Sequence, residues 1–208
     1  MGFYSDRVFP ALLAMASSHF DDDRRALLAR ARGRVLELGV GTGANLGFYG
    51  PDVSEVVAID LHRAVLKRAE KTLQDLTEGG RIPYQVRLQE ADAQALPFDD
   101  ASFDTVVAFL TLCSVDDVDA AAREMRRVLR PGGRLLVLEH VRAEQGSRTG
   151  KWQDRLDPFW QKVAVGCHLN RDTASILDAA GFDVSTLESY REPHTFPTSP
   201  RIRGMVSG

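Results

Sequence analysis

The sequence predicts a single α/β domain, built on a mostly parallel seven-stranded sheet with an antiparallel last strand and helices on both faces. Two observations predict this fold class. Short apolar runs alternate along the chain with segments of helical periodicity, which is the pattern of a parallel sheet flanked by helices. The length of 208 residues is also that of one ordinary domain.

Seven segments have the apolar character of strands. The second of them is apolar almost throughout, as expected of a strand that is covered on both faces. The last two are separated by a stretch rich in proline and turn residues, and we expect them to form a hairpin added to the parallel strands. The predicted strands cover residues 34–38, 55–60, 84–90, 103–110, 134–140, 183–190 and 201–206.

Three segments between the strands have helical spacing. Apolar residues recur at intervals of three and four between 63 and 76. A second helix runs from about Asp117 to Arg130, where Pro131 cannot continue it and the glycines that follow supply left-handed backbone. The third predicted helix covers residues 171–180.

Two segments stand outside this alternation. Residues 1–30 carry an apolar stripe and are predicted to form a helical lid on the main domain, residues 31–208. Residues 143–170 lack clean periodicity and follow the fifth predicted strand. An insertion at that point lies beyond the carboxyl ends of the strands, where ligands bind in open α/β folds. We therefore expect residues 143–170 to recognise a substrate.

Composition restricts the partners and the compartment. The 26 basic and 29 acidic residues nearly balance, so we expect no nucleic-acid partner. No run approaches the ~20 apolar residues that a membrane span needs, and we expect no membrane association. Cys113 and Cys167 lie far apart and form no CxxC pattern. We therefore expect no disulfide framework, no metal site and a cytoplasmic location.

A glycine-rich turn follows the first predicted strand. Gly39, Gly41 and Gly43 let the backbone turn tightly and leave room for a ligand, to which a following helix would offer free N–H groups. The spacing Gly39-x-Gly41-x-x-Ala44 also matches the dinucleotide fingerprint, so a nicotinamide oxidoreductase is an alternative. Glu37 counts against it, because its carboxylate would repel a pyrophosphate. A sulfonium amino acid has a cationic end and no phosphate, and would not be repelled.

Two acidic residues follow the next predicted strands. Asp60 ends the second strand and is placed to accept hydrogen bonds from both hydroxyls of a ribose, as in NAD enzymes. Asp92 follows the third strand, where it can accept from the amino group of an adenine. Together with Glu37, Asp92 favours S-adenosylmethionine over a nicotinamide as the ligand.

In this order the motifs resemble those of the class I S-adenosylmethionine-dependent methyltransferases, which have a Rossmann-like fold. The resemblance covers about residues 30–140. It implies that the glycine turn with Glu37 holds the methionine portion, Asp60 and Leu61 the ribose side, and Asp92 with the Ala93 backbone the adenine. The matching motifs are Glu37-x-Gly39-x-Gly41-x-Gly43, Asp60, Ala91-Asp92-Ala93 with Leu96-Pro97-Phe98, Ser102-Phe103-Asp104 and Arg130-Pro131-Gly132-Gly133.

A narrower resemblance continues beyond residue 140, to the methyltransferase-like proteins that act on alkyl thiols in animals. Those proteins carry an N-terminal membrane-anchoring helix, which we expect this chain to lack or to have in a shortened form. Bacterial phospholipid N-methyltransferases share part of the pattern. The segments are Leu112-Cys113-Ser114-Val115, Leu138-Glu139-His140-Val141, Trp152-Gln153, Asp157-Pro158-x-Trp160 and Gly166-Cys167-x-Leu169-x-Arg171.

The narrower resemblance implies methyl transfer to a small-molecule acceptor, with a thiol as the first choice. The alternatives are an amine, including a phospholipid headgroup, and the oxygen or carbon of a phenol or quinol. A non-catalytic module that binds S-adenosylmethionine is the alternative from another class. We expect a monomer or a homodimer.

The acceptor side offers several candidate catalytic residues. A thiol is mostly protonated at neutral pH, so a nearby base or cation would help it react. His140 ends the fifth predicted strand and is the first candidate, followed by His168 in the insertion and His194 near the last strand. Asp116 is a candidate base, although a helix cap is its preferred interpretation. Cys113 is interpreted as a small buried apolar residue.

Overall fold

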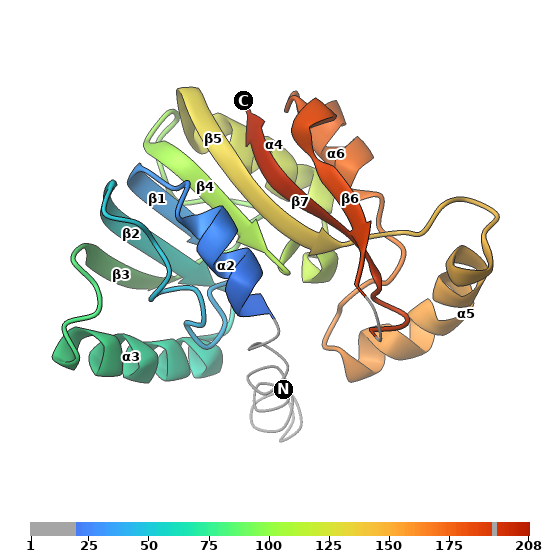
Figure 1. The fold of residues 1–208 in the computed structure, drawn as a ribbon, viewed down its shortest axis with the longest axis horizontal. Helices are drawn as coiled ribbons and strands as arrows, with labels where there is room; N and C mark the ends of the chain where they lie inside the picture. The colour runs from blue at the N-terminus through green and yellow to red at the C-terminus, as the bar shows by residue number, and fades with distance from the viewer. Residues whose placement is uncertain (1–19, 193–194) are drawn as a thin grey trace.

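The computed structural model describes residues 20–192 and 195–208 (Figure 1). Its seven-stranded sheet has the order β3-β2-β1-β4-β5-β7-β6, in which β7 is antiparallel to both of its neighbours. The pairs among β1 to β5 are parallel, which confirms the predicted sheet. The strands are β1 (Gly33–Leu38), β2 (Val53–Asp60), β3 (Gln85–Glu90), β4 (Phe103–Phe109), β5 (Leu129–His140), β6 (Glu188–Arg191) and β7 (Pro200–Ser207).

Helices cover both faces of this sheet, as Figure 1 shows. α2 (Asp21–Leu28) and α3 (Arg63–Glu78) bury their apolar side chains on one face, and α4 (Val118–Val128) and α6 (Thr173–Ala179) bury theirs on the other. Each central strand serves both layers, because successive side chains point to opposite faces. In β1, for example, Val35 belongs to the first core cluster and Leu36 to the second.

The strand order reverses between β1 and β4. From β1 the chain moves outward to β2 and β3, and then returns to place β4 and β5 on the other side. The loops at the carboxyl ends of β1 and β4 therefore leave in opposite directions. Such a switch point is where open α/β sheets bind their ligands.

The glycine-rich turn differs from its prediction, because no helix follows it. Residues 41–47 form successive turns, one of which is closed by a hydrogen bond from the Leu46 N–H to the Gly43 carbonyl at 3.1 Å. Further glycines at 47 and 50 and a proline at 51 disfavour helical backbone here.

The boundary between α4 and β5 also lies earlier than predicted. The helix expected to reach Arg130 ends at Val128, and β5 begins at the next residue rather than at 134. Leu129 is buried, has extended backbone and pairs with Phe103 of β4. Pairing and burial in the sheet override the local helical pattern at this residue.

The strand predicted from residue 183 begins as a short 3-10 turn, η4 (Val184–Thr186). The Asp183 side chain accepts a hydrogen bond from the Ser185 N–H at 3.1 Å, which favours a turn over extended backbone. β6 therefore starts only at Glu188.

The insertion 143–170 contains one helix, α5 (Arg148–Val163), which lies beyond the end of the sheet in Figure 1. Ser147 caps this helix by accepting from the Gly150 N–H at 3.0 Å. The fully buried Gln153 attaches it to the main domain: its amide oxygen accepts from the Ala143 N–H at 2.7 Å, and its amide nitrogen donates to the Pro197 carbonyl at 3.2 Å.

Most of the predicted lid, residues 1–19, lies outside the described residues, so the lid stays a prediction. The described part of residues 1–30 contains α2, whose Leu27 and Leu28 are buried in the first core cluster. No helix in the described part of the chain is both long enough and apolar enough to cross a membrane.

Candidate active site

The glycine turn after β1 has backbone that other residues rarely adopt. Gly39, Gly41 and Gly43 have φ angles of 60°, 58° and 84°. A Cβ on Gly39 would lie 2.5 Å from Cγ2 of Thr111, so the loop after β4 leaves no room for a side chain. At Gly41 the nearest atom to such a Cβ is 3.9 Å away. A ligand can therefore approach the backbone closely at Gly41.

Asp60 connects the end of β2 to this turn. Its carboxylate oxygens accept hydrogen bonds from the Gly41 N–H at 3.1 Å and the His62 N–H at 3.0 Å. Each oxygen has a further lone pair, so the same carboxylate can accept from ribose hydroxyls. The adjacent Leu61 is 53% exposed and offers an apolar surface to a ring.

Asp92 lies in the loop after β3 and is half-buried. It accepts from the Gln94 N–H at 2.8 Å and from the Gln94 side chain at 2.9 Å. Gln94 in turn accepts from the Asp117 N–H at 2.8 Å, which joins this loop to the start of α4. The adjacent Ala93 packs against the second core cluster. The loop that carries Asp92 and Ala93 is therefore fixed in place.

Glu37 has a different setting from the predicted one. It is fully buried, and its carboxylate accepts from Asn45 Nδ2 at 2.9 Å and from the Tyr49 hydroxyl at 2.7 Å. Burial raises the pKa of Glu37 to about 7, against the opposing effect of these two hydrogen bonds. Its side chain thus holds the turn that follows the glycines, and a direct contact with a ligand stays a prediction.

Glu139 joins the ends of β4 and β5 and was missed by the sequence reasoning. One of its carboxylate oxygens accepts from the N–H groups of Thr111 at 2.7 Å and Leu112 at 2.8 Å. The Thr111 hydroxyl donates to the Leu38 carbonyl at 2.9 Å. This buried residue therefore links the carboxyl ends of three strands. An acidic residue inside an apolar strand was the signal that could have found it.

His140, at the end of β5, meets two cysteines. Its Nε2 lies 3.1 Å from Cys167 Sγ, which also accepts from Trp160 Nε1 at 3.4 Å. The donor atoms of Cys113, His140 and Cys167 all lie within 4.8 Å of one another. The hydrogen bond from Cys113, and to a lesser extent the one from His140, lowers the pKa of Cys167. The hydrogen bond to Cys167, together with burial, raises the pKa of Cys113. Sequence spacing alone did not indicate this cluster.

The side chains of the other candidate catalytic residues make different contacts, although the His168 N–H donates to the Cys113 carbonyl at 2.7 Å. The His168 imidazole is 3.1 Å from Gln161 Nε2 and 3.4 Å from an Asp157 oxygen. Asp116 is exposed, and its predicted capping role is wrong, because Asp117 caps α4 by accepting from the Ala120 N–H at 2.8 Å. Catalytic roles for His168 and Asp116 stay predictions, and His194 lies outside the described residues.

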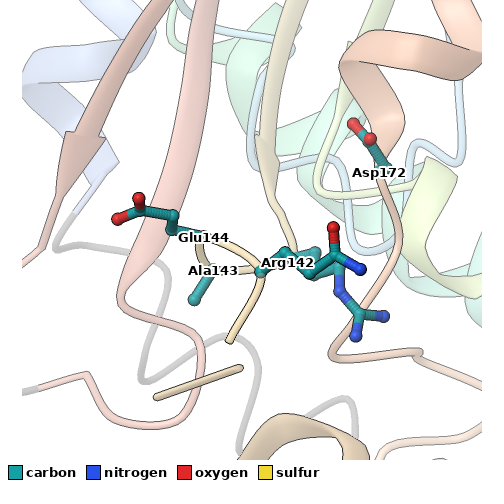
Figure 2. Close-up of a pocket in the computed structure, with 5 residues that line it drawn as sticks. Arg142, Ala143, Glu144 and Asp172 are labelled. Atoms are coloured by element: carbon teal, nitrogen blue, oxygen red, sulfur yellow. The ribbon is translucent and has the colours of Figure 1, made fainter. Parts of the chain in front are cut away.

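A pocket of about 380 Å³ lies at the start of the insertion. Figure 2 shows the residues that line it. It is lined by residues 142–145 after β5 and by Asp172, which caps α6. Residues 143–145 belong to the insertion that is expected to recognise a substrate, but none of the predicted catalytic or cofactor-binding residues lines this pocket. The candidate active site therefore lies at the strand ends.

Comparisons with known proteins agree with this geometry. A family described as a methyltransferase domain matches residues 36–137. Thiol S-methyltransferase TMT1B of Homo sapiens is 32% identical over 209 residues, which cover 94% of this chain and 84% of that protein. Phosphatidylethanolamine N-methyltransferase of Cereibacter sphaeroides is 38% identical over 124 residues, 59% of each chain.

A solved structure shares the fold. The structure of a putative methyltransferase from Bacillus halodurans has a TM-score of 0.67 at 19% identity, and the match covers 89% of this chain and 94% of that one. Because these proteins are all methyltransferases, the nicotinamide oxidoreductase alternative is rejected. The chain belongs to the methyltransferase family that includes thiol S-methyltransferase TMT1B, and it is an enzyme that uses S-adenosylmethionine as its methyl donor.

Proposed function

We propose that this enzyme transfers a methyl group to the sulfur of a small-molecule thiol. The similarity to human TMT1B carries the proposal, because it extends over nearly the whole chain, including the insertion on the acceptor side. The similarity to the phosphatidylethanolamine enzyme covers only 59% of the chain. The near balance of acidic and basic residues supports a small acceptor over a nucleic acid.

On the donor side, the residues at the ends of β1, β2 and β3 fit the methyl donor. S-adenosylmethionine supplies a methyl group that its sulfonium sulfur already activates. The open backbone at Gly41 would hold the methionine portion, and the spare lone pairs of Asp60 would accept from the ribose hydroxyls. The exposed Leu61 would lie on the ribose side, and the fixed loop of Asp92 and Ala93 would hold the adenine.

On the acceptor side, the chain chiefly has to position the thiol and exclude water, since the donor is already activated. Good alignment of two reactants is worth about 7 kcal/mol or more of the barrier. His140 is 5% exposed and lies at the end of β5, across the switch point from Asp60. We assign it to the acceptor side, where it helps to keep the acceptor sulfur in its thiolate form.

Release of S-adenosylhomocysteine from the purified enzyme tests the acceptor class. The enzyme would be offered S-adenosylmethionine with matched panels of alkyl thiols, amines, phenols and quinols. We expect turnover with the thiols. Turnover with amines alone would favour the phospholipid headgroup alternative that the second relative suggests. Donor binding without turnover on any panel would support the non-catalytic alternative.

We also propose a cytoplasmic location. Cys113 and Cys167 are both free thiols although their side chains lie close together. An oxidising compartment favours pairing of such thiols, whereas the cytoplasm keeps them reduced. Fractionation of cells that express the full-length protein checks this proposal, and recovery in an oxidising compartment with the thiols paired would contradict it.

A further inference from the structure

Three side chains that can ligate a soft metal ion meet at the carboxyl ends of β4 and β5. Cys113 lies in the 3-10 turn η3 (Leu112–Ser114) after β4, His140 is the last residue of β5, and Cys167 follows α5. The cluster lies beside the donor site, because Thr111 of the same loop is the residue against which Gly39 is packed. Cys113 and His140 are buried, and Cys167 is partly exposed.

The spacing of the three donor atoms fits zinc. Two thiolates and one imidazole around a tetrahedral zinc ion lie about 3.5–3.8 Å from one another, given Zn–S and Zn–N bonds of about 2.3 and 2.0 Å. The donor atoms here lie within 4.8 Å of one another, and the contact between His140 Nε2 and Cys167 Sγ is 3.1 Å. Small side-chain shifts would bring all three to the spacing of ligands.

Charge and hydrogen bonding around the cluster point to a bound cation. Glu139, next to His140, is fully buried, and one of its carboxylate oxygens has no hydrogen-bond partner within residues 20–192 and 195–208. Within the same residues, Nδ1 of the buried His140 also lacks a partner, whereas its other ring nitrogen, Nε2, is the one that contacts Cys167. Once both thiols are deprotonated, they and this carboxylate would carry negative charge in a buried volume. The Arg171 guanidinium, which donates to the Leu112 carbonyl, offsets part of that charge. A divalent cation would offset the rest.

We propose that Cys113, His140 and Cys167 bind a zinc ion whose fourth coordination position takes the acceptor thiol. Three protein ligands and one open position are the pattern of catalytic rather than structural zinc sites. On coordination the S–H bond of the acceptor would break, the proton would leave to solvent, and the sulfur would keep the electron pair. That sulfur would then bond to the methyl carbon as the bond from this carbon to the sulfonium sulfur breaks, and S-adenosylhomocysteine would leave with the second electron pair. The role of the open position rests on the thiol acceptor proposed above.

This proposal departs from the absence of a metal site that we expected from the sequence. That expectation rested on the separation of the two cysteines along the chain. Cys113 and His140 come from the ends of neighbouring strands, and α5 returns the chain so that Cys167 reaches them. A disulfide between the two cysteines would use two of the three donors and leave no role for His140, so we favour the metal.

Metal content is the first test. The full-length protein, purified in a reducing buffer and stripped with a chelator, would be titrated with zinc chloride and its bound zinc measured. We expect one zinc ion per chain. Cys113→Ser, His140→Ala and Cys167→Ser should each weaken zinc binding at least about tenfold, since even outer-shell partners are worth that much. His168→Ala is the matched control and should keep the affinity for zinc, because that imidazole contacts Asp157 and Gln161 instead.

A spectrum keeps the proposal testable if a variant fails to fold. Cobalt(II) added to the stripped wild-type protein should give thiolate-to-cobalt charge-transfer absorption and the visible bands of a tetrahedral site. Absence of these bands, less than stoichiometric zinc, or a Cys113–Cys167 disulfide that persists in reducing buffer would overturn the proposal.

Measurements of thiol methylation with and without bound zinc distinguish the zinc site from the proposed thiol acceptor. If both hold, stripping should lower thiol methylation at least about tenfold and zinc should restore it. An alkyl thiol should also shift the cobalt spectrum. Stoichiometric zinc with no turnover of any thiol would refute the thiol acceptor and leave the metal site in place. Thiol turnover that is the same with and without bound zinc would refute the role of the open position.

Discussion

Two carboxylates on the donor side differ in depth and therefore in what they can do. Asp60 is partly exposed at the end of β2 and keeps lone pairs available beyond its bonds to Gly41 and His62. Glu37 lies two residues before the glycine turn and is fully buried, and its oxygens accept from Asn45 and Tyr49. The accessible Asp60 can accept from a ligand directly, whereas the observed contacts of Glu37 hold the turn in place.

Replacement of Asp60 by alanine should weaken binding of S-adenosylmethionine. The expected loss is about 1.5–3 kcal/mol, or roughly 10- to 150-fold in Kd, which is the range for hydrogen bonds to a charged group. Isothermal titration of both proteins measures it. Asp52→Ala is the matched control, since Asp52 is an exposed aspartate that precedes β2 at its amino end. Equal affinities of Asp60→Ala and the control would contradict the placement of the ribose.

Glu37 should make the stability of the protein depend on pH. Its pKa is about 7 in the folded chain against 4.5 as its ordinary value, so folding favours its protonated form. The stability that this preference contributes is fully present below pH 4.5 and is lost as the pH rises through 7. At about 1.4 kcal/mol per pH unit, the total change is about 3 kcal/mol.

Urea unfolding between pH 5 and pH 8 measures this dependence, with Glu37→Gln as the comparison. We expect the wild-type protein to lose more stability than the variant over this range. Burial also raises the pKa of Glu139, but that residue is present in both proteins and its contribution cancels in the comparison. Parallel curves for the two proteins would contradict a raised pKa at Glu37.

At the scale of elements, the glycine turn depends on the loop after β4. Gly39→Ala should destabilise the fold for two reasons, the positive φ angle and the contact with Thr111. Gly80→Ala measures the cost of the positive φ angle alone. Gly80 has a φ of 61°, but no atom outside its own chain neighbours lies within 4 Å of the place that its Cβ would take. We expect about 1–2 kcal/mol for Gly80→Ala and about 1–3 kcal/mol more for Gly39→Ala. Thermal unfolding measures both, and equal losses would show that Thr111 moves aside freely.

The helix α5 positions the loop that carries Cys167. Asp157 on α5 is buried and accepts from the Leu169 N–H at 2.6 Å, two residues after Cys167. Asp157→Ala leaves that buried N–H unpaired and should cost about 1–3 kcal/mol of unfolding free energy. Asp154→Ala is the control on the same helix, where an exposed ion pair with Arg142 and an exposed hydrogen bond from Asn170 are each worth at most about 1 kcal/mol. Urea unfolding of the two variants checks this order, and a larger loss for Asp154→Ala would contradict it.

The elements differ in how far sequence could predict them. β2 and β4 are mostly apolar, because both of their faces are covered, and that pattern is plain in the sequence. α5 reverses the usual pattern: Trp152 and Phe159 are 48% and 67% exposed, whereas the polar Gln153 and Asp157 are buried. Its apolar residues therefore do not mark its inner face, and periodicity could not place it.

At the scale of the whole molecule, the candidate donor-site and acceptor-site residues lie on different halves of the sheet. The ends of β1, β2 and β3 carry the glycines, Asp60 and Asp92, all of which are predictable because each directly follows a strand. The ends of β4 and β5 carry Cys113 and His140, which sequence also places at strand ends. Cys167 reaches them only through the tertiary path of the insertion, and no local pattern encodes that contact.

The central claim is that this molecule moves a methyl group from S-adenosylmethionine to the sulfur of a small thiol. The most direct measurement offers the enzyme a methyl donor with an isotopically labelled methyl group, together with an equimolar mixture of an alkyl thiol, an amine and a phenol. Mass spectrometry then identifies the product that carries the label. We predict the labelled methyl thioether. Label on the amine or the phenol, with none on the thiol, would contradict the account.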